Sequence, residues 1–165
     1  FSFRSQENKN APVEQDLAEI HIKVEAAPLS RIYENERNIK EALKDKVKDV
    51  YFYRGKYRNI EYSVLFAVYV REIETKSIIK AVEDSLKDNN LILRSENNGD
   101  NGIEGILLEG FFDKDNKKYV LRGQILKKGA MLWQILAVYP VSKNSDALSQ
   151  RFIDSIEIKN AAEIK

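Results

Sequence analysis

The segment IEYSVLFAVYV, residues 60–70, carries the strongest strand signal in this chain. Successive residues of a strand point to opposite faces of its sheet. Here both alternating sets are apolar: one is Tyr62, Val64, Phe66, Val68 and Val70, and the other is Leu65, Ala67 and Tyr69. A strand that is apolar on both faces is typical of a central strand in a sheet covered on both sides. This segment therefore predicts a layered α+β sandwich.

The other strand signals predict that the sheet is mainly antiparallel. A short strand at residues 49–53 meets Gly55 and leads into the segment 60–70 as a hairpin. Further strands are expected at 19–26, 91–94, 103–112, 118–127, 131–139 and 155–158. Polar or glycine-containing turns join the strands from 103 to 139, and short connections of this kind join antiparallel neighbours.

Three amphipathic segments are predicted to form helices. They cover residues 34–47, residues 75–88 and a C-terminal stretch that Ser145 is expected to cap. The expected fold class is thus a bent, mainly antiparallel β-sheet flanked by helices on both faces, an α/β/α sandwich that forms one domain over 18–158. Residues 1–17 are expected to be a flexible polar lead-in and 159–165 a frayed tail.

The composition excludes several classes of protein. Of the 165 residues, 43% are hydrophobic and 32% are charged, as in ordinary globular domains. The 27 basic and 26 acidic residues give a net charge of +1, so we do not expect nucleic acid as a partner. With no cysteine and a single histidine, His21, the chain lacks thiol chemistry and the ligands of cysteine-bound zinc. No stretch reaches the roughly 18 apolar residues of a membrane-spanning helix.

No segment carries a motif for a metal or a cofactor. The segment DKDNKK, residues 113–118, begins like a calcium loop but has lysine at the fifth and sixth positions, where an oxygen ligand and a glycine belong. The glycines between 99 and 110 do not have the spacing of a phosphate-binding loop. We therefore expect no cofactor and no metal site, and we assign no catalytic residue.

Two sets of residues are candidates for a binding site. The hairpin segment YFYRGKYR, residues 51–58, interleaves rings that can stack with cations that can meet phosphates. Its candidate residues are Tyr51, Tyr53, Arg54, Lys56, Tyr57 and Arg58. A pocket between sheet and helix is the second candidate, lined by Tyr62, Phe66, Trp133 and Tyr139. Both sets also have a structural interpretation, since tyrosines can cover a sheet edge and Trp133 can pack in the core.

Several pieces of the chain together resemble a known family. They are IKVEAAP (22–28), NIEYSVLFAVY (59–69), GIEGILLEG (102–110), KKYVLRGQILKKGAMLWQILAVYP (117–140) and FIDSIEI (152–158). Over residues 19–158 this order resembles the PsbP-like, Mog-type α/β/α sandwich, and within it exported bacterial proteins of unassigned function. The resemblance implies a bent sheet between helices and an accessory, non-catalytic role. Relatives of this type serve as an extrinsic subunit of photosystem II or as a Ran-binding factor, but no motif here carries over a functional residue.

Three hypotheses about function follow. The first is a non-catalytic, exported binding or scaffolding domain of the bacterial cell envelope, with a protein or another envelope component as its partner. The alternative is a protein that binds a small apolar ligand or a lipid in the sheet–helix pocket, and the third is an enzyme. We expect a monomer or a weak homo-oligomer that does not span a membrane. The resemblance, together with a chain that begins at Phe1, predicts an extracytoplasmic location.

Overall fold

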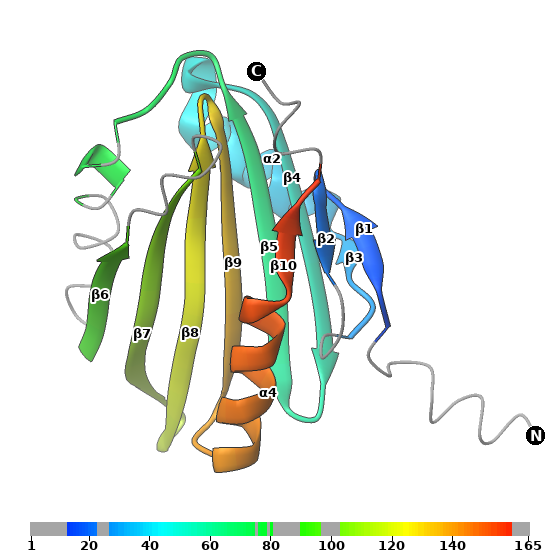
Figure 1. Ribbon diagram of the computed structural model, residues 1–165, viewed down its shortest axis with the longest axis vertical. Helices are drawn as coiled ribbons and strands as arrows, with labels where there is room; N and C mark the ends of the chain where they lie inside the picture. The colour runs from blue at the N-terminus through cyan, green and yellow to red at the C-terminus, as the bar shows by residue number, and fades with distance from the viewer. Residues whose placement is uncertain are drawn as a thin grey trace, which may run out of the picture.

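The computed structural model describes residues 13–22, 27–74, 76–78, 80, 90–96 and 103–159, with the backbone alone for 90–96. A seven-stranded antiparallel sheet dominates it, in the order β3-β4-β5-β9-β8-β7-β6 (Figure 1). Its strands are β3 (Ser30–Arg31), β4 (Val47–Tyr57), β5 (Ile60–Tyr69), β6 (Asn90–Glu96), β7 (Glu104–Lys114), β8 (Lys117–Lys128) and β9 (Met131–Pro140). A second, three-stranded sheet has the order β1-β2-β10 and contains β1 (Gln15–Leu17), β2 (Ile20–Ile22) and β10 (Ile156–Ile158).

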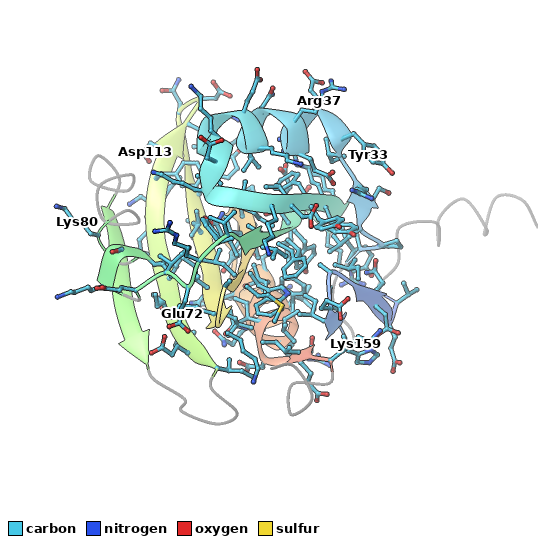
Figure 2. The ribbon with its side chains drawn as sticks, turned by 90° about the horizontal axis from the view of Figure 1, so that it is seen from above. Tyr33, Arg37, Glu72, Lys80, Asp113 and Lys159 are labelled. Atoms are coloured by element: carbon cyan, nitrogen blue, oxygen red, sulfur yellow. The ribbon has the colours of Figure 1, made fainter. Side chains whose placement is uncertain are left out.

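The two faces of the main sheet are covered by different elements, and we name each face after its helix. The α4 face carries the second sheet and the helix α4 (Lys143–Asp154), which lie in front of the main sheet in Figure 1. The α2 face carries the helix α2 (Tyr33–Leu43), which continues into the 3-10 turn η2 (Lys44–Lys46). Figure 2 looks down on the sheet from above and shows α2 on one side of it and α4 on the other. Residues 76–78 and 80 are helical too, and Ile78 packs on the α2 face.

The predicted α/β/α sandwich is wrong. The fold is mostly antiparallel sheet, and a second β-sheet, rather than a layer of helices, covers much of the α4 face. On the α2 face the helix α2 packs against β4, near one edge of the sheet. The apolar pattern of residues 60–70 correctly required cover on both faces, but it did not specify which element supplies that cover. The strands β2 and β10 come from near the two ends of the chain, and their pairing leaves no local sequence signal.

The larger core lies on the α4 face and centres on β5 and β9. The ring of Phe66, only 5% exposed, stacks between Trp133 and Tyr51, with centroid distances of 5.1 and 5.8 Å. The other buried members of this core are Ile20, Ile22, Ile60, Tyr62, Val64, Val120, Leu126, Ile135, Ala137, Tyr139, Phe152 and Ile153. The indole N–H of Trp133 donates a hydrogen bond to the Ala18 carbonyl at 2.7 Å, which ties the β1–β2 turn to this core. The prediction that Trp133 shares a buried strand face with Tyr139 is confirmed.

Two predicted boundaries differ from the structure. The β4–β5 hairpin turns at Arg58 and Asn59, which have φ values of 50° and 65°, and not near Gly55. Gly55 lies inside β4, where an added Cβ would come within 2.7 Å of the Pro28 carbonyl oxygen. The glycine is therefore needed for a close approach between two chain segments. The cap of α4 is Ser142, whose hydroxyl accepts a hydrogen bond from the Ser145 backbone N–H at 3.3 Å.

At the N-terminus, β1 forms within the segment that the sequence analysis assigned to the lead-in. Its Gln15 side chain accepts a hydrogen bond from the Leu29 backbone N–H at 2.7 Å and donates one to the Ala27 carbonyl at 3.0 Å. The expectations for 1–12, 23–26, 97–102, 160–165 and most of 75–88 lie outside the described residues.

Candidate ligand-binding groove

An open groove of about 680 Å³ lies on the α2 face. Its floor comes from the strands β5, β9 and β8, and its walls come from the end of α2 and from the segment that follows β5. The floor residues are Leu65, Tyr69, Ile125, Leu132 and Gln134, and the apolar wall residues are Leu43, Ile73 and Ile78. A volume of this size lies in the usual range of small-molecule sites, about 300 to 1,000 Å³.

The groove lies between two segments that pack on the α2 face, the helix α2 and the segment that contains Ile78. Between them a strip of apolar sheet is left uncovered. Leu43 of α2 packs with Val50 and Ala67 at the β4 side. Ile78 packs with Leu132 and with residues of β7 and β8 at the other side. Tyr69 contacts both clusters, and so it marks the point where the two segments meet. The second apolar set of residues 60–70, to which Leu65 and Tyr69 belong, thus faces a partly open surface.

The mouth of the groove carries charges of both signs. Lys46, Arg71, Glu72 and Glu74 line it and are exposed, and within the described residues none of them forms an ion pair. Val70 lies among them and is 46% exposed. Burial raises the pKa of Tyr69 above its ordinary value, so its phenol remains neutral at physiological pH. The lining is therefore an apolar floor with a charge-balanced mouth.

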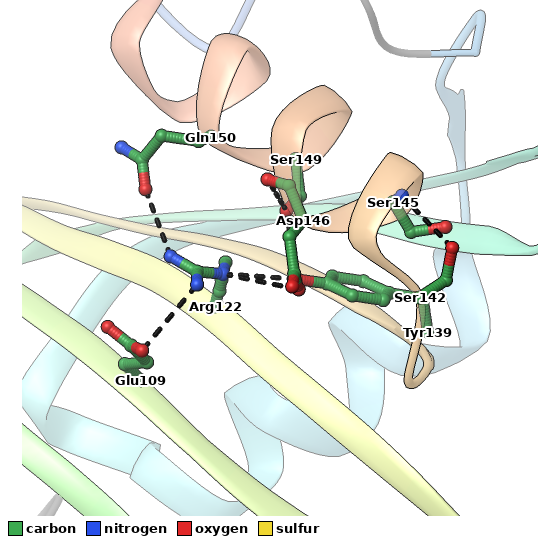
Figure 3. A network of polar contacts seen from close by, with 8 residues as sticks. All are labelled: Glu109, Arg122, Tyr139, Ser142, Ser145, Asp146, Ser149 and Gln150. Atoms are coloured by element: carbon green, nitrogen blue, oxygen red, sulfur yellow. Dashed lines mark hydrogen bonds and ion pairs between the residues drawn. The ribbon is translucent and has the colours of Figure 1, made fainter.

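A polar network on the opposite, α4 face joins the helix to the sheet (Figure 3). The Tyr139 hydroxyl donates to Asp146 Oδ1 at 2.5 Å, and it accepts from Arg122 Nε at 3.0 Å and from Ser149 Oγ at 3.1 Å. Arg122 also donates to Gln150 Oε1 at 3.1 Å and lies 3.5 Å from a carboxylate oxygen of Glu109. The residues that contact Arg122 in Figure 3 thus belong to β7, β9 and α4.

This network holds α4 against the main sheet. Tyr139 is fully buried, and its phenol already has three hydrogen-bond partners. Burial and the hydrogen bond to Asp146 raise the pKa of Tyr139 to about 12, which keeps the phenol protonated. The cavity beside Arg122 and Glu109 measures about 130 Å³, less than a small-molecule site requires.

A second polar cluster lies between α2 and the edge of β4. The guanidinium of Arg31 lies 4.7 Å from the ring centroids of both Tyr33 and Tyr51. It also donates from Nε to Glu36 Oε2 at 2.7 Å and from Nη2 to Oε1 at 3.0 Å. The same Glu36 carboxylate accepts the Phe52 backbone N–H at 3.0 Å. These contacts attach the start of α2 to β4, beside a shallow cavity of about 280 Å³.

The structure separates the rings of the hairpin candidate site from the two cations on the strand, Arg54 and Lys56. Tyr51, Tyr53 and Tyr57 are half-buried against the core of the α4 face. Arg54 and Lys56 are exposed and point to the α2 face, since they alternate with the tyrosines along β4. Arg54 lies 3.3 Å from Glu61 and over the ring of Phe52, and Arg58 in the turn lies over the ring of Tyr57. The rings and the strand cations therefore do not form one continuous surface.

The predicted pocket residues all lie in the core of the α4 face. Tyr62, Trp133 and Tyr139 are fully buried, Phe66 nearly so, and none of the four lines the 680 Å³ groove. The groove uses the opposite alternating set of the same two central strands, including Leu65, Leu132 and Gln134. The sequence did carry this signal, because both sets of residues 60–70 are apolar. It did not show which set would be covered only in part.

Within the described residues, no group of three or more histidine and acidic side chains is placed to hold a metal ion. The single histidine, His21, lies 2.7 Å from Asp16 through Nδ1. In the same part of the chain, no helix is long and apolar enough to cross a membrane. The sequence matches no model of a known protein family, and it matches no curated protein.

Proposed function

We propose that this protein is a non-catalytic binding domain that takes a small apolar molecule or a lipid chain into the groove on the α2 face. The observation that carries the proposal is the 680 Å³ groove, whose floor consists of three aliphatic side chains, the ring of Tyr69 and the amide of Gln134. Exposed apolar surface of this extent costs free energy in water and is typical of a binding site.

The chemistry of the lining supports binding rather than catalysis. Catalysis by a general base or a nucleophile needs two reactive groups within hydrogen-bond reach of each other. The acidic groups of the groove, Glu72 and Glu74, are exposed at its mouth, where they remain solvated. The floor offers only a neutral phenol and a neutral amide, from Tyr69 and Gln134. This arrangement favours the second of the three functional hypotheses.

The proposal is tested with a neutral apolar dye, N-phenyl-1-naphthylamine, whose fluorescence rises in an apolar site. We expect saturable binding to the wild type and at least a fivefold weaker affinity in Val70→Glu, because the substitution removes an apolar contact at the mouth and puts in its place a carboxylate that loses water if the dye covers it. Val141→Glu is the matched control: Val141 is 55% exposed, against 46% for Val70, but lies outside the groove.

Equal dye binding by the two variants would place the dye elsewhere on the molecule and would overturn the groove as the site. Absence of saturable binding to the wild type would do the same. Thermal melting of both variants checks the fold, and similar small changes in melting temperature are expected, because both positions are partly exposed.

We also propose that the domain acts outside the cytoplasm, in the bacterial cell envelope. The support is the resemblance of residues 19–158 to exported PsbP-like proteins. Fractionation of cells that express the natural, full-length protein tests this location separately from ligand binding. Recovery in the cytoplasmic fraction would contradict export and leave the proposed binding site unaffected.

A further inference from the structure

Gln134 is a polar side chain in the middle of an otherwise apolar floor. The register of the main sheet places it between Leu65 of β5 and Ile125 of β8, on adjacent strands. Along β9 its neighbours on the same face are Leu132 and Leu136, which pack in the apolar cluster of this face. Leu65, Ile125 and Leu132 all line the groove beside Gln134. The amide is thus surrounded by aliphatic groups within the sheet.

The amide of Gln134 has no hydrogen-bond partner among the described side chains and backbone groups. An amide offers two donors and one acceptor, and all of them work best when they are paired. In the open groove, water satisfies these groups. When an apolar molecule covers the floor and displaces that water, the amide loses its hydrogen bonds, which weakens binding. A ligand that brings its own hydrogen-bonding group to this point avoids the loss.

We infer that Gln134 is a specificity-determining residue, and that the groove selects apolar molecules that carry a neutral hydrogen-bonding group, such as a hydroxyl, a carbonyl or an amide. This inference rests on the proposed function of the groove. The group must be neutral because the charged side chains of the lining, among them Lys46 and Arg71, lie at its exposed mouth. A charged group on the floor would be desolvated without a counter-ion.

The test uses two competitors of nearly equal size, 2-naphthol and 2-methylnaphthalene, which differ by a hydroxyl in place of a methyl group. Each displaces N-phenyl-1-naphthylamine from the wild type, from Gln134→Leu and from Gln134→Thr. Gln134→Leu should shift the affinity ratio by threefold to tenfold toward the methyl compound, which is the effect of one net hydrogen bond. Gln134→Thr replaces the amide with a hydroxyl, which can still form a hydrogen bond, and should restore part of the preference for 2-naphthol.

The outcomes separate this inference from the proposed function. If both competitors displace the dye but Gln134→Leu leaves their ratio unchanged, Gln134 selects nothing and the groove remains a plain apolar site. If neither competitor nor the dye binds the wild type, the proposed function fails, and the inference fails with it. Thermal melting excludes misfolding as a cause, since leucine on an aliphatic floor is expected to preserve or raise the melting temperature.

Discussion

The carboxylate of Glu36 pairs with the backbone of β4 just beyond the end of β3. The strand β3 is only two residues long. Glu36 is 7% exposed and accepts hydrogen bonds from the Arg31 guanidinium and from the Phe52 backbone N–H. An unpaired backbone N–H at a sheet edge invites pairing with another chain. Glu36 therefore serves both as an anchor for α2 and as a partner for the exposed edge.

Glu36→Gln should lower the free energy of unfolding by about 1 to 3 kcal/mol at neutral pH. Both carboxylate oxygens of Glu36 accept hydrogen bonds, whereas the amide has only one oxygen, so Arg31 or the Phe52 N–H loses its acceptor. Urea denaturation measures this loss of stability. Glu34→Gln is the matched control, since Glu34 lies in the same first turn of α2 but is exposed. A loss of the same size in Glu34→Gln would show that the effect belongs to helix charge and not to the contacts of Glu36.

The same substitution has a pH dependence with a defined sign. Burial by itself raises the pKa of Glu36, but the hydrogen bonds from Arg31 and Phe52 outweigh it and hold the pKa below its ordinary value of 4.5. The charged form therefore stabilises the folded protein above that value, and this contribution is lost as the pH falls through the lower, folded-state pKa. The gap in stability between wild type and Glu36→Gln should shrink below about pH 4.5. A constant gap down to pH 3 would contradict the role of the charge.

At the scale of single residues, strand alternation predicted which side chains are buried, but it did not indicate the open groove. It placed Tyr62, Phe66 and Trp133 on one face, and all three are buried there. It also led to the expectation that these rings line a pocket, whereas they fill the core. Gln134 lies on the opposite face of β9, and its position on an open floor depends on how α2 and Ile78 are spaced across several strands. A pattern within one strand contains no information on that spacing.

At the scale of elements, the cap of α4 lies three residues before the position that the sequence predicted. Both Ser142 and Ser145 have the residue type of a helix cap, and the cap expected from the sequence was Ser145. In the structure Ser142 has extended backbone angles and its side chain caps the helix, while Ser145 is buried in the first turn. The length of β9, which continues to Pro140, determines where the helix can begin.

The capping assignment can be tested by comparing two alanine variants. Ser142→Ala should lower the free energy of unfolding by about 1 kcal/mol, the usual cost of losing a cap. Ser145→Ala should cost less, because alanine is the best helix former and the Ser145 hydroxyl does not cap. Chemical denaturation of the two variants gives both values. A larger loss in Ser145→Ala would support the cap that the sequence analysis predicted.

At the scale of the whole molecule, the sequence predicted the strands and their hairpins better than the assembly of the layers. The meander of β7, β8 and β9 follows from local turns, such as the one at Gly129 with φ of 58°. The second sheet instead pairs Ile22 with Ile156, across most of the length of the chain. Because nothing near either strand specifies its partner, the elements at the chain ends could be placed only from the structure.

The position of Phe66 links these layers and gives a final prediction. Its ring lies in the core that the main sheet, the second sheet and α4 share, and its strand also forms the floor of the groove through Leu65. Phe66→Ala should cost about 3 to 5 kcal/mol, the range for a large aromatic side chain removed from a core. Small domains have only about 5 to 15 kcal/mol of stability, so the whole fold should be weakened. We expect fluorescence of Trp133 and far-ultraviolet circular dichroism to report the same lowered denaturation midpoint. A shift seen by Trp133 alone would mean that the second sheet and α4 unfold as a separate unit, whereas a loss under 1 kcal/mol would contradict the central place of β5.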